Sequence, residues 1–170
     1  MKAHEIFRLL SANEVSEAVV AACEDEAVPD KIAGGVITYQ SIPLKRFAKL
    51  PQETRKAWVR RTLRDKRAAD LSLYVLSTAL THGRAPLVTA FLEALGLPHD
   101  GPNLSFEGEI PEPAAKTVNA AVDSVLKGFP ARHVALYLHA FAAQPDVHWA
   151  SLASRLSSDS RLALEDRSGE

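Results

Sequence analysis

The histidines of this chain have side chains that could serve as metal ligands or exchange protons near neutral pH. Six are present. Metal-binding helices place two histidines at i and i+4, or repeat a Glu-x-x-His unit, and neither pattern occurs. His133 and His139 are six residues apart, about 120° around a helix, so they cannot share a ligand directly. Asp146 and His148 could join His139 only at a site between helices. We therefore predict no metal site and no cofactor.

Residue patterns for nucleophilic or phosphate chemistry are also missing. Cys23 is the only cysteine, which excludes an internal disulfide, and it lies inside an amphipathic pattern that predicts a buried small hydrophobe. Gly-x-Ser-x-Gly does not occur, and Gly34-Gly35 lacks the spacing of a phosphate loop. Tyr74 and Tyr137 lie on the two most apolar segments, where they either pack in the core or line a cavity. We assign no catalytic residue, and an enzyme with a pocket near these tyrosines stays a third alternative.

The distribution of charge is the unusual feature of the sequence. Formal net charge is −1, which argues against a chain that binds nucleic acid or a membrane surface over its whole area. Residues 1–30 nevertheless contain two basic and seven acidic residues, and residues 45–67 contain ten basic and two acidic residues. Half of all the basic residues therefore fall within 23 positions. Within this segment Pro51 suits the first position of a helix, which we predict to run to about Asp65.

Helical geometry gathers this charge on one side of the predicted helix. At about 100° per residue, Trp58 shares one sector with Val59, Thr62 and Leu63, and we expect it to anchor the helix to the core. Arginine predominates on the opposite side, and its planar fork suits phosphate and carboxylate groups. The candidate partner-binding residues are Lys56, Arg60, Arg61, Arg64 and Arg67.

Three interpretations of this basic stripe stay open. It is a solvated helix face, partly neutralised by the acidic first helix; or a docking surface for an acidic protein; or a contact to the nucleic-acid backbone. The sequence shows no helix-turn-helix arrangement and no aromatic platform for base stacking that would support the nucleic-acid interpretation. Phosphate contacts alone would give weak binding that does not depend on base sequence. We favour a non-enzymatic interaction module that docks an acidic partner, with sequence-independent phosphate contacts as the alternative.

The elements that must position this stripe are almost all helices. Ser11-Ala-Asn-Glu14 is a capping box and opens a helix over about 12–25, which Pro29 terminates. Residues 68–82 and 131–143 are apolar nearly all round and predict buried central helices, while 85–95 and a segment opened by Pro113 are amphipathic. Asp146 is expected to cap the last helix, near whose start Trp149 either covers the core edge or marks an exposed contact.

Two further segments have the composition of β-strands. Residues 36–42 and 104–110 could pair as a small two-stranded ribbon, or form two extended loops instead. The fold class that we expect is all-α or nearly so, as a single-domain bundle of about seven helices over residues 1–157, with a frayed polar tail over 158–170. No apolar stretch suits a signal peptide or a membrane span, so we expect a cytoplasmic protein that does not enter the membrane. The oligomeric state and the partner's identity are not encoded in any pattern that we find.

Overall fold

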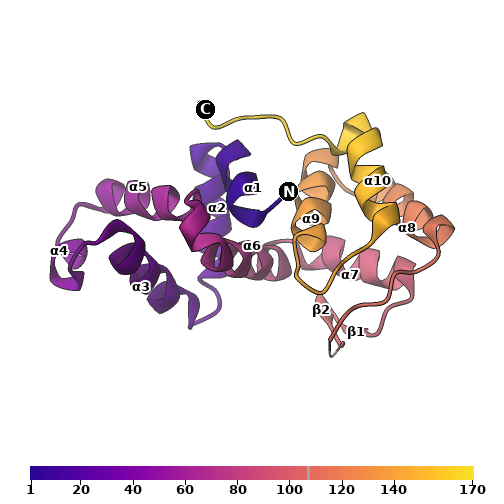
Figure 1. Ribbon diagram of the computed structural model, residues 1–170, viewed down its shortest axis with the longest axis horizontal. Coiled ribbons are helices and arrows are strands. Elements are labelled where there is room, and N and C mark those ends of the chain that lie inside the picture. The colour runs from indigo at the N-terminus through magenta and orange to yellow at the C-terminus, as the bar shows by residue number, and fades with distance from the viewer. Residues whose placement is uncertain (107) are drawn as a thin grey trace. The chain divides into compact units, whose positions relative to one another are not determined.

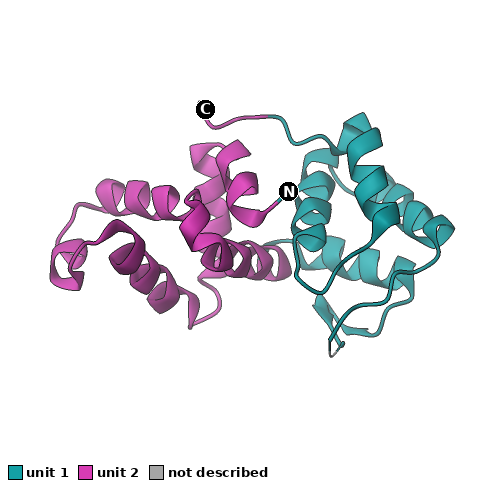
Figure 2. Ribbon diagram, in the orientation of Figure 1, with its two compact units in different colours: residues 1, 83–165 teal, residues 2–82, 166–170 magenta. Residues whose placement is uncertain are grey.

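The computed structural model describes residues 1–106 and 108–170, and they are mostly α-helical (Figure 1). These residues form ten α-helices, two short 3₁₀ helices and one two-stranded sheet. The predicted fold class is confirmed, with more and shorter helices than the seven expected. The chain divides into two compact units: unit 2 holds residues 2–82 and 166–170, and unit 1 holds residues 83–165 and Met1 (Figure 2). The predicted division into 1–157 and 158–170 stays a prediction.

Unit 2 is built from the first six α-helices. The capping box is confirmed, since the Ser11 hydroxyl accepts from the Glu14 amide at 3.1 Å and the Glu14 carboxylate accepts from the Ser11 amide at 2.9 Å. The elements of this unit are α1 (Ala3–Leu9), α2 (Ala12–Ala22), α3 (Val28–Gln40), α4 (Leu44–Ala48), α5 (Gln52–Leu63), the 3₁₀ helix η1 (Lys66–Ala68) and α6 (Ala69–Gly83), whose last residue belongs to unit 1.

The strand predicted over 36–42 is wrong, because helix α3 occupies most of this segment. Val28, Ile32 and Val36 are spaced four residues apart and are all buried, so the burial follows a helical period that the β-branched composition of the segment concealed. Pro29 lies in the first turn of α3, where its missing amide proton needs no partner. Pro29 therefore belongs to the start of α3, in addition to lying beyond the end of α2.

Unit 1 is built from the last four α-helices and the sheet. Its elements are α7 (Ala85–Leu95), β1 (His99–Asp100), β2 (Asn103–Leu104), α8 (Ala115–Gly128), α9 (Ala131–Ala142), α10 (Ala150–Ser158) and the 3₁₀ helix η2 (Ser160–Leu162). The predicted helix over 85–95 is confirmed, and it ends at Gly96 in the left-handed conformation with φ 69°. The predicted Asp146 cap is wrong, since α10 begins later and Trp149 is its N-cap.

The small sheet is a local hairpin and does not join the two segments predicted to pair. Strand β1 pairs antiparallel with β2, placing His99 opposite Leu104 and Asp100 opposite Asn103. Gly101 turns the chain between them with φ 55°, a conformation that costs glycine little. The predicted pairing of 36–42 with 104–110 is therefore wrong; Glu107 of the second segment lies outside the described residues.

An aromatic cluster forms part of the core of unit 1. The ring of Phe91 lies 5.5 Å from that of Tyr137 and 5.6 Å from that of Phe141, both edge to face. Trp149 packs on Phe141 at 5.2 Å and donates its indole N–H to the Ile110 carbonyl at 3.0 Å. Trp149 is 4% exposed, so it covers the core edge and is not an exposed contact.

Helices α6 and α9 have the burial expected of central helices. No residue of 71–81 in α6, or of 132–142 in α9, is exposed. Beyond α10 the chain also makes specific contacts: Leu162 is fully buried, and its carbonyl accepts from the His139 ring at 3.1 Å. Among the helices of the described residues, none combines the length and the apolar character needed to cross a lipid bilayer.

His139 makes the stability of unit 1 depend on pH. Burial lowers the pKa of this imidazole below 6.5, although the bond to Leu162 opposes the shift. The unfolded state therefore takes up its proton at a higher pH than the folded state does. We expect the free energy of unfolding to be full above pH 6.5 and to fall as the pH drops below it. Urea unfolding of the Trp58→Phe variant, in which Trp149 is the fluorescent reporter, measures this free energy at each pH. In the same background, His139→Gln should flatten the dependence of the unfolding free energy on pH between about pH 7 and 5.5. An unfolding free energy that rises on acidification in this range would contradict the assignment.

Gly34 and Gly35 provide a matched test of packing in α3. A Cβ on Gly34 meets nothing within 4 Å, whereas one on Gly35 would overlap a methyl group of Leu71. Gly34→Ala should stabilise the protein by about 0.5–1 kcal/mol through helix propensity. Gly35→Ala gains the same propensity but must displace Leu71, so we expect it to be the less stable variant in thermal unfolding followed by circular dichroism. The reverse order would show that α3 packs differently on α6.

Candidate functional site

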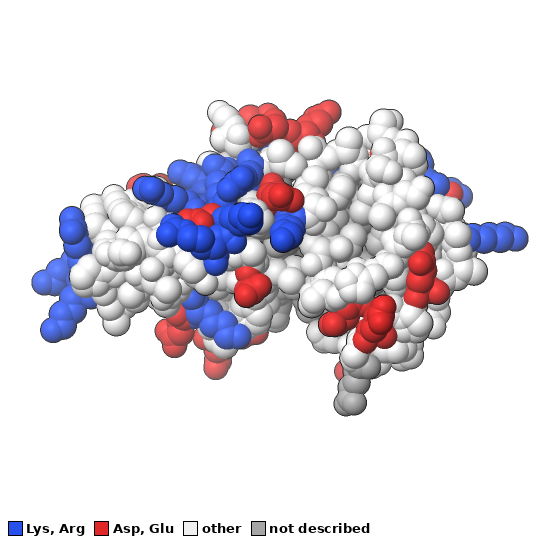
Figure 3. Space-filling view, in the orientation of Figure 1, with Lys and Arg blue, Asp and Glu red and all other residues white. Residues whose placement is uncertain are grey.

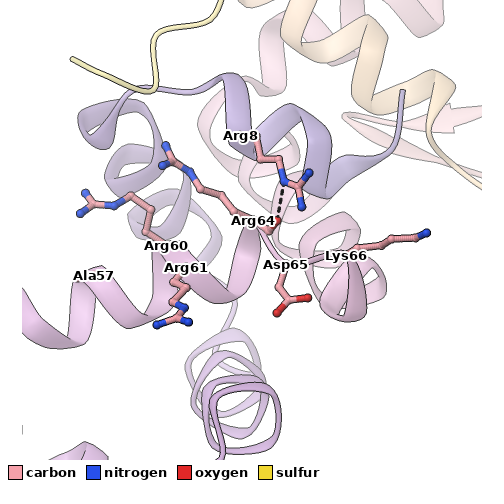
Figure 4. A pocket seen from close by; sticks show the side chains of 7 residues that line it. All are labelled: Arg8, Ala57, Arg60, Arg61, Arg64, Asp65 and Lys66. Atoms are coloured by element: carbon pink, nitrogen blue, oxygen red, sulfur yellow. Dashed lines mark hydrogen bonds between the residues drawn. The ribbon is translucent and has the colours of Figure 1, made fainter.

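Two arginines link the ends of helices α1 and α5 in unit 2. Arg64, the C-cap of α5, donates from Nε to the Phe7 carbonyl at 3.0 Å and from Nη2 to the Leu10 carbonyl at 2.7 Å. In return, Arg8 donates from Nε to the Arg64 carbonyl at 2.9 Å (Figure 4). The last carbonyls of a helix have no partner within it and carry the negative end of its dipole, so a cation from the other helix suits both ends.

This link forms one side of a basic pocket of about 510 Å³ (Figure 4). Five of its seven lining residues are cations and one is a carboxylate. The lining residues are Arg8, Ala57, Arg60, Arg61, Arg64, Asp65 and Lys66. The only carboxylate, Asp65, is already bound by Arg67 at 2.7 Å, and that hydrogen bond lowers the pKa of the Asp65 carboxyl to about 2. The pocket therefore holds an excess of positive charge.

The five predicted binding residues differ in what they contact. Arg64 is committed to α1, and burial, with the nearby charge of Arg60, lowers the pKa of its guanidinium. Arg67 lies in η1, beyond the end of α5, where it binds Asp65 and approaches the Tyr39 carbonyl at 3.3 Å. The expected single stripe through Arg64 and Arg67 is therefore wrong, because α5 ends at Leu63 and the chain turns there.

The remaining three predicted residues lie on α5 itself. Lys56 is exposed and pairs with Glu53 at 2.8 Å. Arg60 and Arg61 have no carboxylate partner among the residues that the structure describes, and both extend away from the helix in Figure 4. The Arg61 guanidinium lies 5.9 Å from the Trp58 ring. Trp58 itself is only half-buried, so the buried anchor of α5 is Leu63 with Thr62.

A second hollow, here called the α2/α5 groove, adjoins the basic pocket in the same unit. It has a volume of about 470 Å³, and its lining residues are Val15, Ser16, Val19, Val20, Cys23, Phe47, Gln52, Arg55, Lys56, Val59 and Arg60. Arg60 lines both hollows, so an apolar surface and a basic surface meet at this one side chain. Figure 3 shows the Lys and Arg side chains gathered over the α5 and α1 part of unit 2, with a separate group at the α4 end.

Sequence reasoning missed several residues of these hollows. Arg8 and Lys66 line the basic pocket, but Arg8 comes from an acidic segment and Lys66 from beyond the helix. Cys23 is exposed at the C-cap of α2 and lines the groove, so its predicted burial is wrong. Partial desolvation raises the pKa of its thiol.

Of the other candidate residues, Tyr74, Gly34 and Gly35 share a hollow of about 420 Å³ in unit 2. Among residues 1–106 and 108–170, no group of three or more His, Cys, Asp or Glu side chains could hold a metal ion. Tyr137 is buried in the aromatic cluster of unit 1, and burial raises its pKa. Tyr74 in unit 2 donates to Asp25 at 3.3 Å, with Lys31 over its ring at 3.6 Å.

In comparisons with known proteins, no family model, no curated protein and no solved structure matches the chain.

Removal of the Arg64 guanidinium should destabilise the protein, because it leaves the Phe7 and Leu10 carbonyls without their charged donor. We expect Arg64→Ala to lower the free energy of unfolding by about 1.5–3 kcal/mol. Arg64→Lys should restore only part of this loss, because lysine cannot donate to both carbonyls in the same fork geometry. Arg61→Ala is the matched control and should change the value by less than about 0.5 kcal/mol. Urea unfolding followed by circular dichroism measures all three. Equal effects for Arg64→Ala and Arg61→Ala would refute the structural role of Arg64.

Proposed function

We propose that this chain is a non-enzymatic interaction module that docks an acidic protein surface through the basic pocket of unit 2. Arg60 and Arg61 are the principal contacts, with Lys56 and Lys66 at the edges. Arg64 and Arg67 hold the pocket in shape, because their guanidinium groups are already engaged by α1 carbonyls and by Asp65. Arginine pairs with carboxylates through two parallel hydrogen bonds, which gives such a surface directional as well as electrostatic selectivity.

One observation carries the choice of a protein partner: the basic pocket and the apolar α2/α5 groove meet at Arg60. Protein interfaces combine an apolar centre with a charged rim, and arginine is enriched among their strongest contacts. A nucleic-acid backbone offers phosphates to the arginines but nothing that would cover Val19 and Val20, the second of which is 70% exposed. The groove therefore favours an acidic protein over the alternative of sequence-independent phosphate contacts.

Reversal of the two free arginines tests this function. The probe is a fluorescent Glu-rich peptide of about 15 residues, with mixed-sequence DNA and RNA of similar charge for comparison, each titrated at about 0.05 and 0.15 M salt. We expect the peptide to bind, and Arg60→Glu with Arg61→Glu to weaken it by about tenfold or more. Lys45→Glu with Arg46→Glu changes the net charge equally, on α4 and outside the basic pocket, and should leave most of the affinity.

Two outcomes would overturn the proposal. Equal losses from both double variants would mean that net charge alone attracts the peptide. Binding of DNA or RNA that exceeds peptide binding, falls steeply with salt and ignores base sequence would assign the pocket to nucleic acid instead.

A further inference from the structure

The two walls of the α2/α5 groove differ in character. Its lining residues on α2 fall within one sector of about 140°, and so do those on α5. The α2 wall presents valines, of which Val15 is buried, Val19 half-buried and Val20 exposed. The α5 wall presents Arg55, Lys56 and Arg60 along successive turns, with Val59 between them. The groove is thus apolar on one side and basic on the other.

No carboxylate of the described residues lines this groove, although α2 is acidic. At about 100° per residue, Glu14 and Glu17 project about 200–260° from Val15, outside the lining sector. Glu24 lies beyond α2 and approaches the His82 ring at 3.6 Å. Lys56 of the basic wall pairs with Glu53 on its own helix, so Arg55 and Arg60 are the cations of this wall that are left to an external ligand.

The walls also restrict the backbone conformation of a ligand. Both α2 and α5 satisfy their backbone groups internally, so they offer no unpaired edge to which an extended strand could add. Polyproline ligands need grooves lined with aromatic rings, and Phe47 is the only aromatic residue in this lining. A helix needs only side-chain contacts, and it presents an apolar stripe flanked by polar residues, matching the two walls.

We propose that the α2/α5 groove binds an amphipathic α-helix of the partner protein. The apolar side of the partner's helix packs on Val19, Val20 and Phe47. Carboxylates one turn apart along the flank of that helix pair with Arg55 and Arg60. This inference rests on the proposed docking function, and it specifies the partner as an acidic helix with an apolar face. Charge complementarity with the basic wall and the exposed apolar surface of the other wall carry it.

Three peptides of equal length and net charge test the inference against the full-length protein. The first places Leu at i, i+3, i+4 and i+7 with Glu on the flanks; the second has the same composition in scrambled order; the third replaces every Leu by Ala. We expect the first to bind about tenfold more tightly than the other two in fluorescence anisotropy. Cys23, the only cysteine, lines the groove and is exposed, so its maleimide labelling should slow only with the first peptide.

A matched pair of surface variants locates the contact. Val20 is 70% exposed in the groove, and Leu44 is 58% exposed on α4 but outside the groove lining, so neither change should unfold the protein. Val20→Ser removes apolar surface without adding charge, so it should weaken the first peptide by about tenfold and leave the Ala peptide unchanged. Leu44→Ser should change the binding of neither peptide, and circular dichroism checks that both variants are folded.

The outcomes separate this inference from the function on which it rests. Equal binding of all three peptides, with Cys23 labelled at the same rate throughout, would overturn the helix-in-groove inference while leaving an acidic docking function in place. Failure of every acidic peptide to bind would remove the proposed function as well. Protection of Cys23 by DNA or RNA, but not by the first peptide, would assign the groove to nucleic acid.

Discussion

The exchange of hydrogen bonds between Arg8 and Arg64 is the interaction on which the basic surface of unit 2 depends. Helix α1 ends among fully buried side chains, Phe7 and Leu10, whose carbonyls accept from one guanidinium. Unpaired buried carbonyls are costly, and a charged donor offsets that cost more than a neutral one would. Because Arg8 reciprocates at the end of α5, the two helix ends are fixed together, and the charges of both chain segments face one pocket.

Such a concentration of cations repels itself, and the chain offsets part of this repulsion locally. Asp65 binds Arg67, and Asp166, from the segment that returns to unit 2, lies near enough to Arg64 to favour its charged form. The same segment contributes an amide hydrogen bond from Arg167 to the Leu9 carbonyl at 2.9 Å. These contacts stabilise the framework of the pocket, and Arg60, Arg61 and Lys66 remain without a carboxylate partner among the described residues. Arg64 and Arg67 thus hold the pocket in shape while Arg60 and Arg61 are left to bind a partner. A fixed frame around unpaired arginines favours a docking surface that is selective.

Local signals predicted the elements that depend on local chemistry. The Ser11 capping box, the helix over 85–95 and the all-round apolar helices were each identified from a few neighbouring residues, and the structure confirms them. Helix α3 was missed because β-branched residues and two glycines outweighed the four-residue spacing of its buried positions. In this case tertiary burial overrode local propensity.

The candidate site shows the limit of the same reasoning. The excess of charge over 45–67 is visible in the sequence, and so is its helix, which is why Arg60 and Arg61 were found. The roles of Arg64 and Arg67 depend on partners at Phe7, Leu10 and Asp65 that helical periodicity does not reveal. Cys23 was expected inside the core because it lies within the amphipathic pattern of the first predicted helix. Helix α2 ends at this residue, however, and its side chain is exposed at the groove.

We infer that Arg64 holds helices α1 and α5 together, whereas Arg60 and Arg61 are available to a partner. Nitrogen-15 NMR of the arginine Nε–H groups tests this division of roles, in the free protein and during titration with the Glu-rich peptide. We expect a slowly exchanging Nε–H for Arg64 that the peptide leaves in place, and fast-exchanging Nε–H groups for Arg60 and Arg61 that shift and become protected on binding. Fast exchange at Arg64 in the free protein, or peptide-induced shifts at Arg64 with none at Arg60 and Arg61, would contradict it.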